Sequence, residues 1–394
     1  MKKLLLASTA ATVMTGSLVG AAFAEDVKVG ILLGFTGPLE TIMPHMADSA
    51  ELAFREISET GKFLDGSTIS SVRADSTCVD ASAATAAAER LVTADGVVAI
   101  MGADCSGVTG AVLSNVAVPN GVVMISPSAT SPGLSTVEDN DLFFRTSPSD
   151  ARQGEILADV LEEQGISSVA VTYNNSDYGK GLADAFAANF DGEITLSAPH
   201  EDGKADYSAE IAALASAGGE LLVVLGYIDQ GGKNIIQSSV DTGAFDTFLV
   251  GDGMYGESLL GLGDIVEGSF GVVPWAEGEG TDRFTELGTE AGITVDSTYT
   301  RESYDAGALI ALAMAKGGEA TREAVAANVM DVANAPGEPI LPGEFEKALD
   351  ILAEGGDIDY IGATNVELIG AGEAAGSYRY YTITDGAYET VDIR

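Results

Sequence analysis

The chain has 394 residues, with 60 acidic and 19 basic side chains, a formal net charge of −41 and 46% hydrophobic residues. The apolar share is large enough for a folded core and excludes disorder throughout, and the negative charge makes nucleic acid and anionic membrane surfaces poor partners. Two histidines and two cysteines are too few for zinc ribbons, iron–sulfur clusters or histidine metal sites, so we expect no metal and no cofactor.

The N-terminus has the pattern of a secretory signal peptide over residues 1–24. The basic pair Lys2-Lys3 precedes a mostly apolar stretch, and Ala22-Phe23-Ala24 is a small-x-small cleavage site. A membrane anchor is the alternative interpretation, but a spanning helix needs about 20 strongly apolar residues and this stretch is shorter. We therefore expect an exported protein without a membrane anchor.

Export changes the interpretation of the two cysteines, Cys78 and Cys105. An even number of cysteines in an oxidising compartment usually pairs, and a separation of 27 residues is too long for a redox CxxC motif. We therefore expect a disulfide between Cys78 and Cys105. Two free buried thiols are the alternative.

Short β-branched runs alternate with helical runs along most of the chain. In the first half, strands are expected over 27–35, 68–74, 96–102 and 122–126, and helices over 47–60, 81–93 and 107–116. The same alternation begins again after residue 152, where a helix is expected to end at residue 164. Strands are then expected over 169–173, 193–197 and 221–225, and helices over 181–189, 205–217 and 231–242. This alternation predicts parallel sheets with helices on both faces, in two similar α/β lobes.

A third section, from about Trp275, returns to helical patterns. Helices are expected over 282–291, 302–315 and 322–329, a Gly- and Pro-rich loop over 334–343, partly helical material over 345–356, and a terminal hairpin over 377–383 and 388–393.

The motifs that usually mark enzymes are missing or weak. The chain has no GxxxxGK[ST], HExxH or GxSxG motif. The segment 251–256 fits GxGxxG, but Asp252 inside it would repel a pyrophosphate, so it is a weak dinucleotide signal. We expect His45 at the surface or at a cleft rim, and His200 exposed beside Glu201 and Asp202. A secreted hydrolase is therefore an unfavoured alternative.

The most informative segments follow predicted strands, because open α/β sheets bind ligands at the carboxyl ends of their strands. The segment 102–107 joins a strand to a helix and places Ser106 as an N-cap, where free backbone N–H groups attract a carboxylate. The segment 126–132 follows the next strand and is rich in hydroxyl groups. Ordinary capping and turn chemistry is the alternative for both segments.

A series of short segments completes the pattern, in this chain order: Val27-Lys28-Val29-Gly30-Ile31, Thr36-Gly37-Pro38, Asp75-Ser76-Thr77-Cys78, Gly102-Ala103-Asp104-Cys105-Ser106, Ser126-Pro127-Ser128-Ala129-Thr130-Ser131-Pro132, Tyr178-Gly179-Lys180-Gly181, Tyr227, Asp252 and Tyr304-Asp305-Ala306. In the order of these segments, the chain resembles the type I periplasmic ligand-binding proteins that feed ABC importers. Within these proteins it resembles the leucine/isoleucine/valine-binding group. The two cysteine segments are similar to those that this group joins by a disulfide. The resemblance covers nearly all of the chain after the signal peptide.

The resemblance implies six ligand-binding residues: Ser106, Ser128, Thr130, Tyr178, Tyr227 and Asp252. Ser106 and Thr130 would meet the carboxylate of an amino acid. The carbonyl of Ser128 and the side chain of Asp252 would meet its ammonium, and the two tyrosines would close from the second lobe. The family acid is usually glutamate, and an aromatic residue often stands at the position of Ile42, so the preferred ligand side chain stays open.

We therefore expect an α/β fold of two Rossmann-like lobes with parallel sheets, joined by three hinge crossovers near 147–149, 274 and 372–376. The N-terminal lobe would comprise 25–148 and 275–374, and the C-terminal lobe 149–274 and 375–394. The expected function is that of a monomeric periplasmic binding component of an ABC importer, which delivers an amino acid, branched-chain or similar, to permease subunits and catalyses nothing. An amide, urea or an aromatic carboxylate is the alternative ligand, and Asp252 discriminates because it would repel a ligand with only negative charge.

Overall fold

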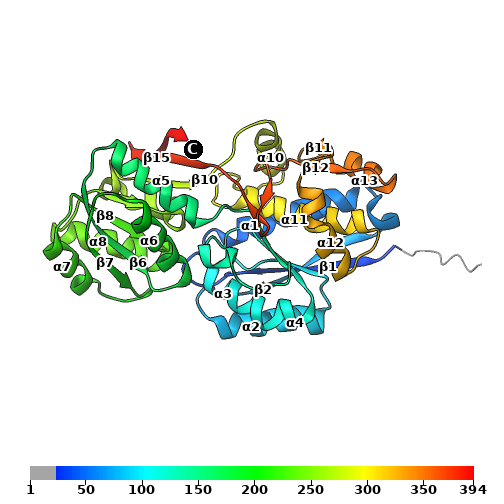
Figure 1. Cartoon of the computed structure of the whole chain (residues 1–394), viewed down its shortest axis with the longest axis horizontal. Coiled ribbons are helices and arrows are strands. Elements are labelled where there is room, and N and C mark those ends of the chain that lie inside the picture. The colour runs from blue at the N-terminus through cyan, green and yellow to red at the C-terminus, as the bar shows by residue number, and fades with distance from the viewer. Residues whose placement is uncertain (1–23) are drawn as a thin grey trace, which may run out of the picture.

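The protein is represented by a computed structural model, of which residues 24–394 are described. The predicted signal peptide therefore lies, apart from Ala24, outside the described residues. The described strands form two seven-stranded sheets and one small two-stranded sheet. Figure 1 shows the two large sheets in separate lobes, with the green lobe on the left and the blue, cyan and orange lobe on the right. Within 24–394, no helix combines the length and apolar character needed to cross a bilayer.

The sheet of the N-terminal lobe has the strand order β13-β14-β5-β4-β3-β1-β2, and its pairs are parallel except β13 with β14. Its strands are β1 (Asp26–Leu33), β2 (Thr68–Asp75), β3 (Ala99–Gly102), β4 (Val123–Ser126), β5 (Phe143–Arg145), β13 (Leu368–Ile369) and β14 (Glu373–Ala374). Its helices are α1 (Met43–Glu59), α2 (Ala81–Arg90), α3 (Ser106–Val112), α4 (Val118–Asn120), α10 (Glu279–Glu290), α11 (Thr300–Gly317), α12 (Arg322–Ala333) and α13 (Phe345–Ala353), with the short helical turns η1 (Phe63–Gly66), η2 (Leu91–Asp95), η3 (Leu113–Ala117) and η4 (Pro132–Ser135).

The sheet of the C-terminal lobe has the order β16-β15-β10-β9-β8-β6-β7, in which only the pairs made by β15 are antiparallel. Its strands are β6 (Ser168–Asn174), β7 (Glu193–His200), β8 (Leu221–Leu225), β9 (Phe248–Val250), β10 (Phe270–Pro274), β15 (Tyr378–Thr384) and β16 (Ala387–Ile393). Its helices are α5 (Asp150–Glu163), α6 (Asp177–Asn189), α7 (Ser208–Ala217), α8 (Lys233–Thr242) and α9 (Glu257–Leu260), with the turns η5 (Ile228–Gly232), η6 (Asp252–Met254) and η7 (Gly263–Val266).

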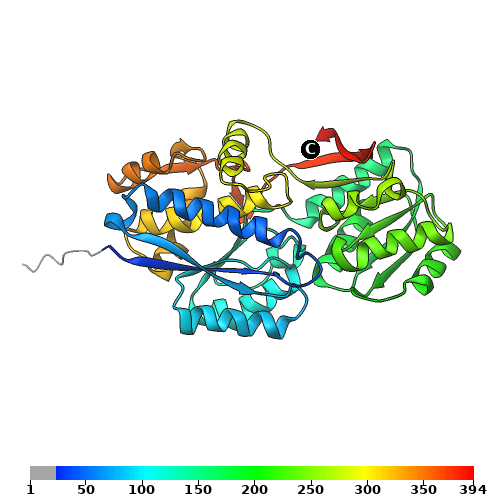
Figure 2. The ribbon, with the colours of Figure 1, turned by 180° about the vertical axis from the view of Figure 1, so that it is seen from behind.

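Strands at the centre of each sheet are buried on both faces because helices cover both sides. All five residues of β8, Leu-Leu-Val-Val-Leu, are buried, as a continuous apolar run in a covered parallel sheet should be. Helix α11 packs against α1, and the view from behind shows the two helices side by side (Figure 2). Gly307 permits this approach, since a Cβ there would lie 3.0 Å from the carbonyl oxygen of Ala50.

Three segments of chain cross between the lobes: 146–149 after β5, 275–278 after β10, and 375–377 after β14. The predicted fold class is therefore confirmed, with two lobes of mostly parallel sheets joined by three crossovers. The prediction of a continuous loop over 334–343 is wrong in part. Residues Glu338–Ile340 form β11, which pairs in parallel with β12 (Ile358–Tyr360) around α13.

A disulfide joins Cys78 to Cys105, and both residues are buried. It connects the loop after β2 to the loop after β3, immediately before the first turn of α3. The cross-link therefore limits how far these two strand-end loops can separate.

Replacing both cysteines by alanine should lower the free energy of unfolding by about 3 to 4 kcal/mol, because the unfolded chain regains the freedom that a 27-residue cross-linked loop removes. Urea unfolding of oxidised wild type and of the double variant measures this difference. Labelling of the unfolded, unreduced wild type should find no free thiol, and two labelled thiols would disprove the pairing.

His200 is buried, with only 1% of its surface exposed, so the expected exposed position is wrong. The residue ends β7, where its Nδ1 lies 2.9 Å from the hydroxyl of Thr172 and its Nε2 has no hydrogen-bond partner among the described residues. Acidic neighbours in the sequence suggested a surface position, but the chain turns inward at the strand end. Burial lowers the pKa of His200 to about 4.

The unfolded state should bind a proton at the His200 ring near pH 6.5, before the folded state does. Stability should therefore fall as the pH decreases from about 6.5 towards 4, by up to about 3 kcal/mol from this residue. Urea unfolding at pH 7 and pH 4.5 should show a smaller loss in the His200→Gln variant than in wild type. Equal losses in both proteins would contradict the assignment.

Candidate functional site

The six residues predicted to bind ligand all follow the carboxyl ends of strands, where the two lobes meet. Ser106 follows β3, Ser128 and Thr130 follow β4, and Tyr178, Tyr227 and Asp252 follow β6, β8 and β9. Five of them are buried and Ser128 is half-buried. Two hollows between the lobes reach this region: one of about 750 Å³ is lined by Ser106, and one of about 450 Å³ is lined by Tyr227.

The carboxyl group of Asp252 is held by hydroxyl groups from both lobes. Tyr178 of α6 donates a hydrogen bond to Oδ1 at 2.6 Å, and Tyr299, which directly precedes α11, donates to Oδ2. The Tyr178 ring also stacks on Tyr227, with 5.1 Å between centroids. Burial, and next the charge of Asp252, raises the pKa of Tyr178 well above its usual value, so its hydroxyl keeps the proton that it donates.

Tyr299 is a site residue that the sequence analysis missed. It adopts a left-handed backbone conformation, with φ of 63°, and belongs to no strand-end motif, so no sequence signal pointed to it. The nearby Tyr304-Asp305 pair, which the resemblance singled out, lies inside the N-terminal lobe instead. The Tyr304 hydroxyl donates to Glu56 at 2.5 Å, and Asp305 accepts from the hydroxyl of Tyr360 at 2.9 Å.

A buried chain of hydrogen bonds links Thr130 of one lobe to Asp252 of the other. Thr130 donates to Asp150 Oδ2 at 2.8 Å, and the Asp150 N–H donates back to the Thr130 carbonyl at 2.9 Å. The amide group of Gln153 donates to Asp150 at 2.9 Å and accepts from the Asp252 N–H at 3.1 Å. Burial, and next the nearby Asp252, raises the pKa of Asp150 well above its usual value, which favours a proton on Asp150.

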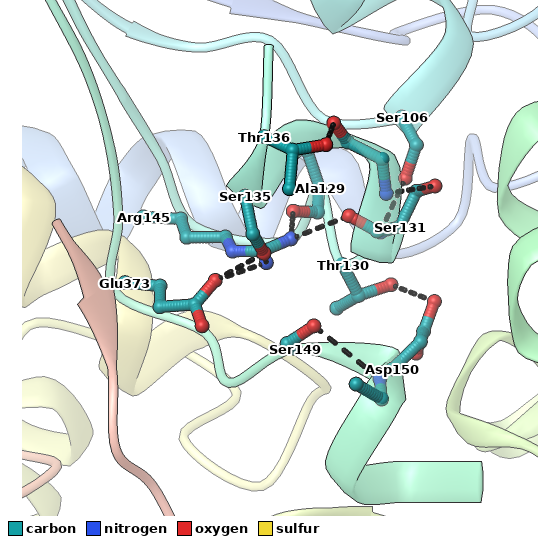
Figure 3. A network of polar contacts seen from close by, with 12 residues as sticks. Ser106, Ala129, Thr130, Ser131, Ser135, Thr136, Arg145, Ser149, Asp150 and Glu373 are labelled. Carbon is teal, nitrogen blue, oxygen red and sulfur yellow. Dashed lines mark hydrogen bonds and ion pairs between the residues drawn. The ribbon is translucent and has the colours of Figure 1, made fainter. Parts of the chain in front are cut away.

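Arg145 fixes the loop that carries Thr130 (Figure 3). Its guanidinium group is almost fully buried and donates to the carbonyl oxygens of Ala129 and Ser131, both at 2.9 Å. Glu373, from β14, neutralises the arginine by an ion pair. Backbone carbonyls on either side of Thr130 are thereby held, so the hydroxyl of Thr130 keeps a defined direction. An arginine that ends a strand carries no sequence signal for this role, and it was also missed.

The predicted N-cap role of Ser106 is wrong, because Cys105 occupies the N-cap position and caps no N–H group with its side chain. Ser106 is the first residue of α3, and its hydroxyl oxygen accepts a hydrogen bond from the N–H of Ser131 at 3.1 Å. The hydroxyl of Ser128 donates to the carbonyl of Asp104 at 3.0 Å. Both serines therefore connect the two neighbouring strand-end loops.

The lobes also touch at a second place, where the loop before α1 meets η5. The hydroxyl of Thr41 donates to Asp229 Oδ2 at 2.7 Å, and the Asp229 N–H donates to the carbonyl of Pro38 at 3.2 Å. Ser258 donates to the other carboxyl oxygen of Asp229 at 2.5 Å. The bonds of Asp229 with Thr41 and Pro38 hold the loop before α1 against the C-terminal lobe, and the bond from Ser258, within that lobe, fixes the Asp229 carboxylate, so the arrangement is a closed one.

Within residues 24–394, one group of side chains has the spacing of metal ligands: Cys78, Asp104 and Cys105. Its two sulfur atoms are bonded to each other in the disulfide, so they do not offer thiolates to an ion.

Comparison with known proteins shows the family to which this chain belongs. The sequence pattern of the family described as periplasmic binding protein matches residues 26–345. The chain is 33% identical over 264 residues to the Leu/Ile/Val-binding protein homolog 3 of Brucella melitensis biotype 1. The aligned region covers 66% of this chain and 69% of that protein.

Solved structures share the fold. The branched-chain amino acid transporter substrate-binding protein LivJ from Streptococcus pneumoniae, in complex with isoleucine, has a TM-score of 0.78 and 23% identity, over 94% of this chain and 99% of that one. The solute-binding protein of an ABC transporter from R. palustris, in complex with 4-hydroxybenzoate, has a TM-score of 0.74 and 18% identity, over 94% and 97%. This chain belongs to the periplasmic binding protein family, in the type I branched-chain amino-acid group, and it is a substrate-binding protein and not an enzyme.

Proposed function

We propose that the protein is the periplasmic binding component of an ABC importer and carries an amino acid, branched-chain or similar, between its lobes. The observation that carries this proposal is the buried carboxyl group of Asp252, only 3% exposed, at the meeting point of the lobes. No basic side chain of the described residues pairs with it; its partners are the hydroxyls of Tyr178 and Tyr299. A ligand ammonium would provide the positive partner that a buried carboxylate favours.

The opposite wall suits the carboxylate of the same ligand. The Ser106 hydroxyl and the uncapped first turn of α3 offer donors on the N-terminal lobe, and the Thr130 hydroxyl would turn its single proton from Asp150 to the ligand. Donor-rich groups in one lobe and an acid in the other match the two charges of a zwitterion. Tyr178 and Tyr227 would pack against the ligand from the C-terminal lobe.

The ligand would favour the closed form, because only that form allows both lobes to contact it. The closed lobes would then present one surface to the permease subunits. We retain the lobe limits 25–148 with 275–374 and 149–274 with 375–394, export by the signal peptide 1–24, and a monomeric state as parts of this proposal.

An amide, urea or aromatic carboxylate ligand is the second candidate. The solved R. palustris structure of the same fold is a complex with 4-hydroxybenzoate, so this fold accommodates an aromatic carboxylate. Asp252 opposes an aromatic acid at the central site, since two negative charges would meet in a buried space. The amino acid is therefore favoured there.

The Asp252→Asn variant should bind branched-chain amino acids about a hundredfold or more weakly, because the ligand ammonium loses its charged partner. The melting temperature of the ligand-free protein should change little, since asparagine has nearly the same shape. Calorimetric titration with L-leucine, L-isoleucine and L-valine measures the affinity. Asp264→Asn, which removes an exposed acid of the same lobe, is the control. Normal binding by Asp252→Asn would show that no ammonium meets this residue.

The Asp229→Ala variant should weaken binding of the same amino acids by about three- to tenfold, mainly by faster dissociation, because the closed form loses the hydrogen bonds that Thr41 donates across the lobes to this carboxylate. Thr41→Val removes one of these bonds without changing charge and should act in the same direction. Stopped-flow measurement of the dissociation rate tests both variants. Unchanged dissociation rates in both would mean that these contacts do not stabilise the closed form.

A further inference from the structure

A cavity of about 480 Å³ lies between the lobes at the second crossover, and none of the six predicted ligand-binding residues lines it. Its walls come from the loop before α1, the segment after η6, the crossover after β10 and the terminal hairpin. The side chains that matter below are Ile42, Tyr255, Trp275, Arg379 and Tyr388. The volume falls in the range of small-molecule sites.

Two arginines from different lobes share the ring of Trp275. The guanidinium carbon of Arg301, in α11, lies 4.3 Å from the ring centroid, and that of Arg379, in β15, lies 4.9 Å from it. Both arginines are more than nine-tenths buried. A chain with 19 basic and 60 acidic side chains thus places two buried cations beside one hollow.

The acids nearby do not satisfy these cations. Arg301 pairs with Asp296 at 3.2 Å, and three-quarters of the Asp296 side chain is exposed to solvent. No carboxylate oxygen of the described residues lies within 4.0 Å of the Arg379 guanidinium nitrogens. Glu257, the other acid of the cavity wall, is exposed.

Arg379 also has an N–H group that donates to no acceptor among the described residues. Its group donates to the hydroxyl of Tyr255 at 3.3 Å and to the carbonyl of Tyr388 at 2.9 Å, and its buried Nε has no partner among the described residues. An arginine has five N–H donors in a planar fork that matches a carboxylate. A buried cation without an anionic partner is costly, so a carboxylate entering the cavity would be favoured.

We propose that this cavity binds the carboxylate of a small organic anion at Arg379, with the body of the anion against Ile42 and the Tyr255–Tyr388 stack. The two rings lie 4.1 Å apart between centroids and offer an aromatic wall. The carboxylate has two chemical sources. It belongs either to a separate small acid or to the side chain of an amino acid whose ammonium lies at Asp252, and the second source rests on the proposed function.

Trp275 is the single tryptophan of the chain, so its fluorescence reports on this cavity. The experiment titrates the full chain with benzoate, with L-glutamate and with L-glutamine at constant ionic strength, and measures Trp275 fluorescence and calorimetric heat. We expect benzoate to bind, or L-glutamate to bind more tightly than L-glutamine. Arg379→Gln should weaken the carboxylate-dependent binding at least about tenfold.

A second variant avoids the buried arginine. Thr294→Glu adds a negative charge at an exposed position of the cavity rim and should also weaken carboxylate binding. Thr289→Glu adds the same charge at an exposed position outside the cavity wall and should leave it unchanged.

The Asp252→Asn variant separates the two sources. Benzoate binding that persists in Asp252→Asn identifies a separate acid, and loss of the L-glutamate preference in Asp252→Asn identifies an amino-acid side chain. The proposal is overturned if neither carboxylate binds selectively, or if Arg379→Gln and Thr294→Glu bind as wild type does. Binding of any one of L-leucine, L-glutamate and L-glutamine supports the amino-acid function, whereas only a dependence on Arg379 supports this proposal, so the two can fail separately.

Discussion

The carboxyl group of Asp252 is the constraint on which the site depends. It is buried where the lobes meet, and it accepts hydrogen bonds from Tyr178 of one lobe and from Tyr299 of the other. A buried carboxyl group needs hydrogen-bond donors or a cation. Here the donors come from the two lobes, which are joined by three crossovers. The electrostatics of one side chain are therefore tied to the relative position of the lobes. A ligand with a positive charge would change both together.

The N-terminal wall of the site is held by contacts that leave little freedom to its loops. Arg145 binds the carbonyls on either side of Thr130, and the disulfide ties the loop after β3 to the loop after β2. Asp150 and Gln153 continue the hydrogen bonds from Thr130 to the backbone of Asp252. A wall that is already ordered costs less conformational entropy when a ligand binds.

The distribution of charge is uneven on a small scale. The acidic residues give the chain its strongly negative total, yet two buried arginines flank Trp275 at the crossover between the lobes. The central site has the opposite character, with the acids Asp150 and Asp252 close together. The two proposed sites between the same lobes would therefore take ligand groups of opposite charge.

The sequence by itself determined the alternation of strands and helices, the two-lobed fold and the strand ends at which Ser106, Thr130 and Asp252 lie, because these follow from local periodicity and from short segments. Only the tertiary structure decided that Tyr299, Asp150 and Arg145 join them, that His200 is buried, and that Arg301 and Arg379 share one tryptophan ring. These residues come from segments far apart in the chain and carry no local pattern. Their environment arises from the packing of one lobe against the other, and that packing depends on long-range contacts that no sequence window contains.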